Sequence, residues 1–154
     1  MKETTIRSAR IGEVNILLDL WRDADAEPSV SDDVDSVSRL LAQHPDGVLV
    51  AEVDGVVVGA LIAVWDGWRG NLYRLAVLPA HRRLGIARAL VDEGEQRLRR
   101  AGCVRVTALV MHEHAWATSF WSAAGYDHDR RVIRFVGNLR ESSRRARQAP
   151  GPPT

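Results

Sequence analysis

The chain has 154 residues, a length that fits one compact domain. Hydrophobic residues make up 45% and charged residues 27% of it, as in an ordinary globular protein rather than a disordered or fibrous one. The formal net charge is +1, yet residues 140–154 hold four arginines and one glutamate, which leaves the remainder mildly acidic. Such a body lacks the broad basic face that nucleic-acid binding needs. We therefore expect no nucleic-acid partner and a flexible, basic, proline-rich tail at 140–154.

Cys103 is the single cysteine of the sequence, so no internal disulfide can form and nothing points to an oxidising compartment. It lies between apolar stretches and is expected to be a small core residue. Residues 1–9 lack the apolar core of a signal peptide, and no apolar run approaches membrane-spanning length. We expect a cytoplasmic protein with no membrane partner.

The N-terminal third predicts one strand followed by two amphipathic helices. Residues 4–7 are prone to form a strand, and apolar residues then recur at helical spacing from Ile11 to Trp21. Pro28 ends this region. Acidic residues at 32–35 favour the N-terminus of a second helix. The apolar stripe of that helix is Val34, Val37, Leu40 and Leu41.

The middle of the chain predicts a meander of three strands. Residues 48–53 are rich in β-branched side chains, Asp54-Gly55 is a strong hairpin signal, and 56–65 continue as the second strand. A turn at 66–71 and a third strand at 72–78 are expected to follow.

The C-terminal half predicts a β-α-β crossover. Apolar residues beyond Gly85 share one face of a helix that Gly102 ends, and 104–110 form the next strand. Such a crossover requires parallel strands and is almost always right-handed. A last helix ends at Gly125, and a closing strand is expected at 132–136.

The turn between the third strand and its helix reads Arg82-Arg83-Leu84-Gly85-Ile86-Ala87. A helix N-terminus presents unpaired N–H groups and partial positive charge, so an anion such as pyrophosphate can dock there. The pattern lacks the lysine-serine ending of a nucleoside-triphosphate loop and the three glycines of a dinucleotide site. The alternative is an ordinary turn whose arginines only face water.

This stretch carries a resemblance. Leu75-Ala76-Val77-x-Pro79 followed by Arg82-x-x-Gly85-x-Ala87 resembles the acetyl-CoA signature of the GNAT family of N-acetyltransferases. A second motif, Ala117-x-x-Phe120-Trp121-x-x-x-Gly125-Tyr126, is similar to the late helix of that family and the turn after it. The order of elements matches from Thr4 to about Leu139.

The resemblance implies an α/β domain over 1–139, with about four helices flanking a mixed, mostly antiparallel sheet that splays between 72–78 and 104–110. Acetyl-CoA would lie in that gap as co-substrate. Its pantetheine arm would meet backbone groups of Leu75 and Val77, and its pyrophosphate the Arg82 turn. The implied contacts are Leu75, Ala76, Val77, Arg82, Arg83, Leu84, Gly85, Ile86, Ala87, Arg88, His114, Phe120 and Trp121.

The sequence departs from the family where a proton must move. Trp121 stands where many members have a tyrosine that protonates the leaving thiolate, and an indole N–H is no usable acid. Asn71 or Leu109 stands where some members have a glutamate base. Three alternatives stay open: proximity with a water relay, replacement by His114, Tyr73 or Tyr126, or acyl-CoA binding without turnover.

The resemblance also implies direct attack by a primary amine in a ternary complex. The amine would come from a small molecule, a protein N-terminus or a lysine. Trp65 and Trp68 flank the turn before the cofactor strand and are candidates for an acceptor rim, and Asp25 could attract a cationic amine from the other side. His112-Glu113-His114 lacks zinc-site spacing, so no metal is expected. A monomer and a homodimer are both compatible with the sequence.

Overall fold

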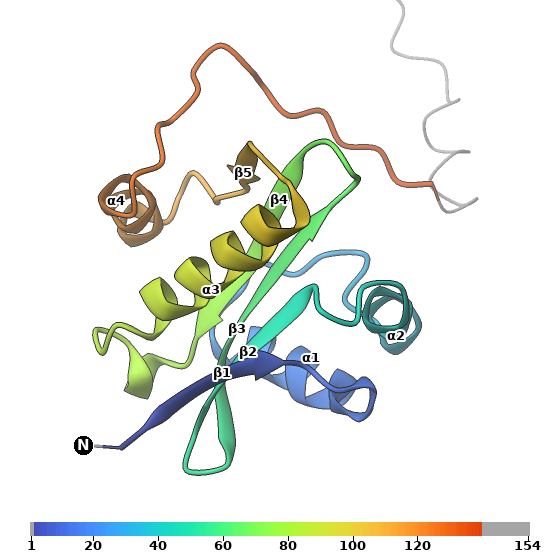
Figure 1. Cartoon of the computed structure of the whole chain (residues 1–154), viewed down its shortest axis with the longest axis vertical. Coiled ribbons are helices and arrows are strands. Elements are labelled where there is room, and N and C mark those ends of the chain that lie inside the picture. The colour runs from blue at the N-terminus through green and yellow to red at the C-terminus, as the bar shows by residue number, and fades with distance from the viewer. Residues whose placement is uncertain (1, 140–154) are drawn as a thin grey trace, which may run out of the picture.

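A computed structural model describes residues 2–139, which form one five-stranded sheet with the strand order β1-β2-β3-β4-β5 (Figure 1). The strands are β1 (Thr4–Ser8), β2 (Val48–Val53), β3 (Val56–Trp65), β4 (Gly70–Val77) and β5 (Val106–Ala108). Neighbours from β1 to β4 are antiparallel, whereas β5 is parallel to β4. The predicted mixed, mostly antiparallel sheet is confirmed. The predicted tail at 140–154 lies outside the described residues.

Four α-helices cover the two faces of the sheet. They are α1 (Val14–Asp23), α2 (Val34–Gln43), α3 (Ile86–Ala101) and α4 (Ala115–Ala123), with short 3-10 turns at Ile11–Glu13 and Pro79–His81. The core beneath α1 and α2 includes Trp21, and the core beneath α3 includes Cys103. Both residues are buried, as predicted.

Local signals fixed several boundaries. At the β2–β3 hairpin, Asp54 and Gly55 have φ values of +50° and +79°, which suit the positive φ that a type I′ turn requires at both central residues. The Asp33 carboxylate caps α2 by accepting a 2.8 Å hydrogen bond from the Ser36 N–H. Gly102 ends α3 in a left-handed conformation. Each of these ends is therefore set by residues next to it.

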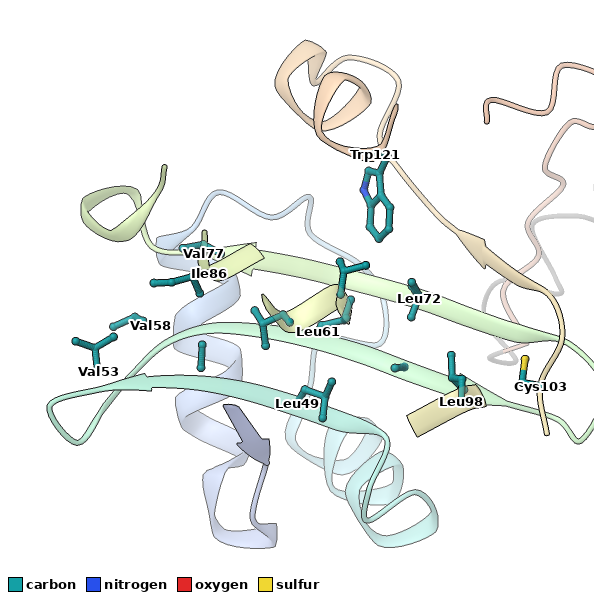
Figure 2. Packing of buried hydrophobic residues seen from close by; sticks show 14 residues of the cluster. Leu49, Val53, Val58, Leu61, Leu72, Val77, Ile86, Leu98, Cys103 and Trp121 are labelled. Atoms are coloured by element: carbon teal, nitrogen blue, oxygen red, sulfur yellow. The ribbon is translucent and has the colours of Figure 1, made fainter. Parts of the chain in front are cut away.

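Side chains from the strands and from α3 interlock in the larger core (Figure 2). Leu49, Leu61 and Leu72 are fully buried on the sheet, and Leu90 and Val91 are fully buried on α3. Figure 2 also shows Trp121 pointing from α4 toward the sheet, so α4 is anchored over β4 by a large aromatic side chain.

Several expectations were wrong in their extent. The strand expected at 132–136 is not formed, and Ile133 and Phe135 are 79% and 87% exposed. The segment pairs with no strand edge within the described chain, and β-branched composition alone does not supply the backbone partners that a strand requires. Ile11 and Val34 were expected in apolar stripes but are exposed. Strand β5 spans 106–108 rather than 104–110, and β4 begins at Gly70.

One feature of β4 was not predicted. Ala60 pairs with Ala76 and Ile62 with Tyr73, so β4 has one more residue than β3 across the same interval. Arg74 sits in this bulge with a φ of +52°, a conformation that non-glycine residues rarely adopt. Because of the extra residue, Leu72 and Leu75 both face α3, although they are three positions apart.

Candidate functional site

A gap opens in the sheet between β4 and β5. Their parallel pairing covers only Gly70 to Leu72, and the Leu109 N–H donates to the Leu72 carbonyl at 3.2 Å just beyond it. Strand β4 then continues to Val77 with no strand on that side in residues 2–139. The Leu78 N–H bonds to β3, so by alternation the backbone groups of Leu75 and Val77 face the gap. The predicted splay is confirmed.

The turn that leads into α3 presents a row of backbone donors. Arg83 and Gly85 have φ values of +63° and +81°, and no side chain in the described chain caps the helix. The first bond inside α3 runs from the Ala89 N–H to the Gly85 carbonyl at 3.0 Å. The N–H groups of 85–88 therefore lack partners within the helix. Left-handed residues next to a helix N-terminus form a concave anion site.

The three arginines of this region point in different directions. Arg83 is exposed. Arg88 pairs with Asp92 at 3.0 Å on the surface of α3. Arg82 turns inward, and its Nε donates to the Val77 carbonyl at 2.9 Å while Nη2 donates to the Ala24 carbonyl at 3.0 Å. Of the three predicted phosphate arginines, Arg82 thus has its guanidinium bound to two carbonyl groups of the protein.

His114 and Phe120 were expected at the far end of the cofactor, with Trp121 in the position of the usual tyrosine. His114 is the N-cap residue of α4, is half-buried, and its ring centroid lies 6.0 Å from that of Trp116. Trp121 is 7% exposed and packs edge-on against Phe120 and Tyr126. The indole is therefore part of the core, whereas the imidazole of His114 is only half-buried.

The two tyrosines do not have lowered pKa values. Burial raises the pKa of the Tyr73 hydroxyl above its usual range, and burial raises that of Tyr126 further, with Glu95 acting in the same direction. A tyrosine with a raised pKa is a poorer proton donor to a thiolate. Tyr73 lies on the α1–α2 face of the sheet, whereas Tyr126 packs against Trp121.

The predicted acceptor-rim residues fall at opposite ends of β4. Trp65 packs into the core beneath α3, and Trp68 is exposed with the Arg69 guanidinium 4.3 Å from its ring centroid. Both flank the start of β4, and a strand of 8 residues extends about 25 Å. They are therefore distant from the Arg82 turn. Asp25 follows Ala24 directly, so the structure brings Asp25, and not the tryptophans, close to Arg82.

An ion pair on the α1–α2 side was missed by the sequence reasoning. Arg74 Nη2 lies 2.8 and 2.9 Å from the two carboxylate oxygens of Asp32, and both side chains are largely shielded from solvent. The guanidinium also lies 5.3 Å from the ring centroid of Trp21. The only hint in the sequence is an arginine within a predicted strand, and its direction depends on the bulge.

Residues 2–139 contain no group of three or more histidine, cysteine or acidic side chains placed to hold a metal ion. Within the same range no helix is both long enough and apolar enough to cross a bilayer.

Comparison with known proteins defines the class to which this fold and site belong. Residues 14–126 match the model of the Acetyltransferase (GNAT) family. An acetyltransferase of Sodalis glossinidius is 33% identical over 128 residues, which are 83% of this chain and 90% of that protein. One of Photorhabdus laumondii is 38% identical over 110 residues, which are 71% and 76% of the two chains. The chain belongs to the GNAT acetyltransferase family.

Solved structures support the same fold. An aminoglycoside N-acetyltransferase in complex with CoA superposes with a TM-score of 0.71 at 20% identity, covering 90% of this chain and 97% of that one. Ard1 of Thermoplasma volcanium gives a TM-score of 0.73 at 21% identity, covering 91% and 90%. At this identity the likeness describes the arrangement of the chain.

Proposed function

We propose that this protein transfers the acetyl group of acetyl-CoA to a primary amine by direct attack in a ternary complex. The observation that carries the proposal is the uncapped N-terminus of α3, with left-handed Arg83 and Gly85, next to the unpaired edge of β4. Membership of an acetyltransferase family and the CoA complex of a structural neighbour support it.

Two backbone surfaces would hold the co-substrate. The N–H groups of 85–88 receive the pyrophosphate, assisted by the positive end of the 16-residue helix α3. The amide groups of the pantetheine arm pair with Leu75 and Val77, as an added strand would. The Val77 carbonyl already accepts a bond from Arg82, so at Val77 the N–H is the group left for the ligand.

The chemistry needs no acid for the leaving thiolate and one acceptor for the proton of the amine. The amine nitrogen attacks the thioester carbon, a C–N bond forms, the C–S bond breaks, and the CoA thiolate leaves with the electron pair. The nitrogen loses one proton to water or to the imidazole of His114. Correct placement of the two reactants can contribute up to roughly 7–11 kcal/mol of barrier reduction. The burial of Trp121 is compatible with this route, because the thiolate departs without a tyrosine proton.

The acceptor is proposed to approach from the side of α1 and α2. Asp25 and Glu27 are exposed in the loop between these helices, and carboxylates there attract a cationic amine. Small-molecule amines, protein N-termini and lysines all carry such a group. A cytoplasmic location stays a prediction.

A second candidate is a non-catalytic acyl-CoA sensor, which is favoured by one observation. Trp121, in the place of the usual acid, is buried between Phe120 and Tyr126 and cannot supply a proton.

A turnover screen separates the two candidates. The protein is incubated with isotopically labelled acetyl-CoA and a panel of polyamines, aminoglycosides, peptides with free N-termini and lysine peptides. Free thiol release and labelled products by mass spectrometry are the readouts. We expect labelled product from at least one amine class. Binding of acetyl-CoA with no product across the panel would favour the sensor.

A further inference from the structure

The loop between α1 and α2, residues 24–33, is attached at its start to the turn that precedes α3. Ala24 is the C-cap residue of α1, and the helix ends in a Schellman motif, with Ala26 N–H bonded to the Trp21 carbonyl at 2.9 Å and Asp25 N–H to the Arg22 carbonyl at 3.2 Å. The Ala24 carbonyl accepts its bond from Arg82 at 3.0 Å. A cation at a helix C-terminus is a favourable cap.

The far end of loop 24–33 is attached to β4. Asp32 bonds to Arg74 in the bulge at 2.8 and 2.9 Å. Within the loop, the Ser29 N–H donates to the Asp32 carboxylate at 2.9 Å, so this end is also ordered locally. Two arginines, Arg74 and Arg82, therefore hold the loop at its two ends against the part of β4 that β5 has left.

The guanidinium of Arg82 joins three segments. Its backbone belongs to the turn proposed for pyrophosphate, its Nε holds the carbonyl of Val77 on the strand proposed for pantetheine, and its Nη2 holds Ala24. Its Cζ also lies 5.6 Å from the ring centroid of Trp116 on α4. The turn and the strand proposed to bind the cofactor are thus both connected to the Arg82 side chain. The second hydrogen bond of that side chain, to the Ala24 carbonyl, connects it to the loop that contains Asp25.

We propose that Arg82 is a positioning residue that couples acyl-CoA binding to the order of loop 24–33. This inference rests on the function proposed above. When the cofactor fixes the turn and Val77, the guanidinium is fixed as well, and its bond to Ala24 strengthens the end of α1 and the loop. Linkage requires the reverse effect to be equal, so an ordered loop favours acyl-CoA to the same extent.

Hydrogen exchange with CoA as the probe tests the coupling without any acceptor. Exchange is measured by mass spectrometry for 83–88 and for 25–32, in the free protein and at saturating CoA. In the wild type we expect CoA to slow exchange in both segments, by at least about threefold in the loop. In Arg82→Gln we expect CoA to protect the turn but not the loop. Loop exchange in the free variant should rise about tenfold, the effect of losing one charge-assisted hydrogen bond.

Three further variants guard against a purely structural explanation. Arg82→Lys keeps the charge but lacks the planar fork that donates to the Val77 and Ala24 carbonyls together. It should therefore lose the coupling as Arg82→Gln does. The lysine variant tests the proposal even if the glutamine variant folds poorly. Arg83→Gln removes the neighbouring exposed charge; it should weaken CoA binding yet retain loop protection once CoA saturates. Asp32→Asn cuts the other attachment and should speed exchange at 29–32. Because an ordered loop favours acyl-CoA, this variant should also bind CoA more weakly than the wild type.

The outcomes separate the two proposals. CoA protection of 83–88 with no change at 25–32 in the wild type would overturn the coupling and leave the acyl-CoA site intact. Loop protection that survives in Arg82→Lys would also overturn it. Absence of protection at 83–88 would overturn the acyl-CoA site and, with it, the coupling.

Discussion

Replacement of Gly85 by glutamate tests the anion site at the start of α3. Gly85 has a φ of +81°, and a Cβ built there meets no atom within 4 Å. The substitution therefore causes no clash, and its cost to folding is about 1–2 kcal/mol of backbone strain. The new carboxylate lies in front of the N–H groups of 85–88, where it competes for the donors and repels the pyrophosphate.

The size of the effect follows from two contributions. A charge at a helix N-terminus is worth about 0.3–2 kcal/mol, and two like charges about 4 Å apart repel by roughly 1–4 kcal/mol near a protein surface. About 3 kcal/mol in total corresponds to a loss of roughly 100-fold in acetyl-CoA affinity. Isothermal titration with acetyl-CoA measures this loss directly.

Gly67 offers a matched control. Its φ is +94°, and a Cβ built there also meets no atom within 4 Å, so Gly67→Glu carries the same strain and the same charge. It lies in the turn between β3 and β4, at the opposite end of β4 from Gly85. Gly67→Glu should bind acetyl-CoA as the wild type does. An affinity of Gly85→Glu within threefold of wild type, or an equal loss in both variants, would show that the pyrophosphate does not bind at the start of α3.

Three other predictions concern stability and chemistry. Hydrogen bonds from Arg7 lower the pKa of the Glu13 carboxyl to about 2. The ionised carboxylate therefore stabilises the fold fully above pH 4.5, and this stabilisation is lost as the pH falls toward 2. Glu13→Gln should lower the free energy of unfolding in urea by about 2–3 kcal/mol at pH 7 but by little at pH 2. His114→Ala should lower kcat at least about tenfold while Trp121→Phe keeps most of it; the opposite pattern in steady-state assays would reverse their roles. A Cβ on Gly70 would lie 2.8 Å from Cys103 Sγ, so Gly70→Ala should cost about 1–3 kcal/mol in thermal unfolding, and an unchanged Tm would contradict this packing.

The sequence predicts the fold well where the determinants are adjacent residues. Asp54-Gly55 defines a hairpin whose strands have the expected boundaries, and Gly102 ends α3 where expected. The run at 132–136 shows the limit, because its composition favours a strand but the structure supplies no partner edge to it. Pairing depends on the arrangement of the whole chain, which local propensity does not contain.

The same distinction applies to the candidate site. The turn from Arg82 to Ala87 could be found because one short stretch contains the glycine, the helix start and the charges. The partners of its arginine could not be found, since Arg82 bonds to a carbonyl 58 positions away and Arg74 to an aspartate 42 positions away. The bulge at Arg74 also changes which side chains of β4 face α1, and no local signal marks an extra residue in a strand.

We propose that acetyl-CoA binds through the backbone of the α3 turn and the open edge of β4. Titration of ¹⁵N-labelled protein with acetyl-CoA, followed through its backbone amide resonances, tests it most directly. We expect the largest shifts at Gly85, Ile86, Ala87 and Val77, whose N–H groups would gain acceptors. Saturating binding with the largest shifts in other parts of the chain, or no shifts at millimolar acetyl-CoA, would contradict it.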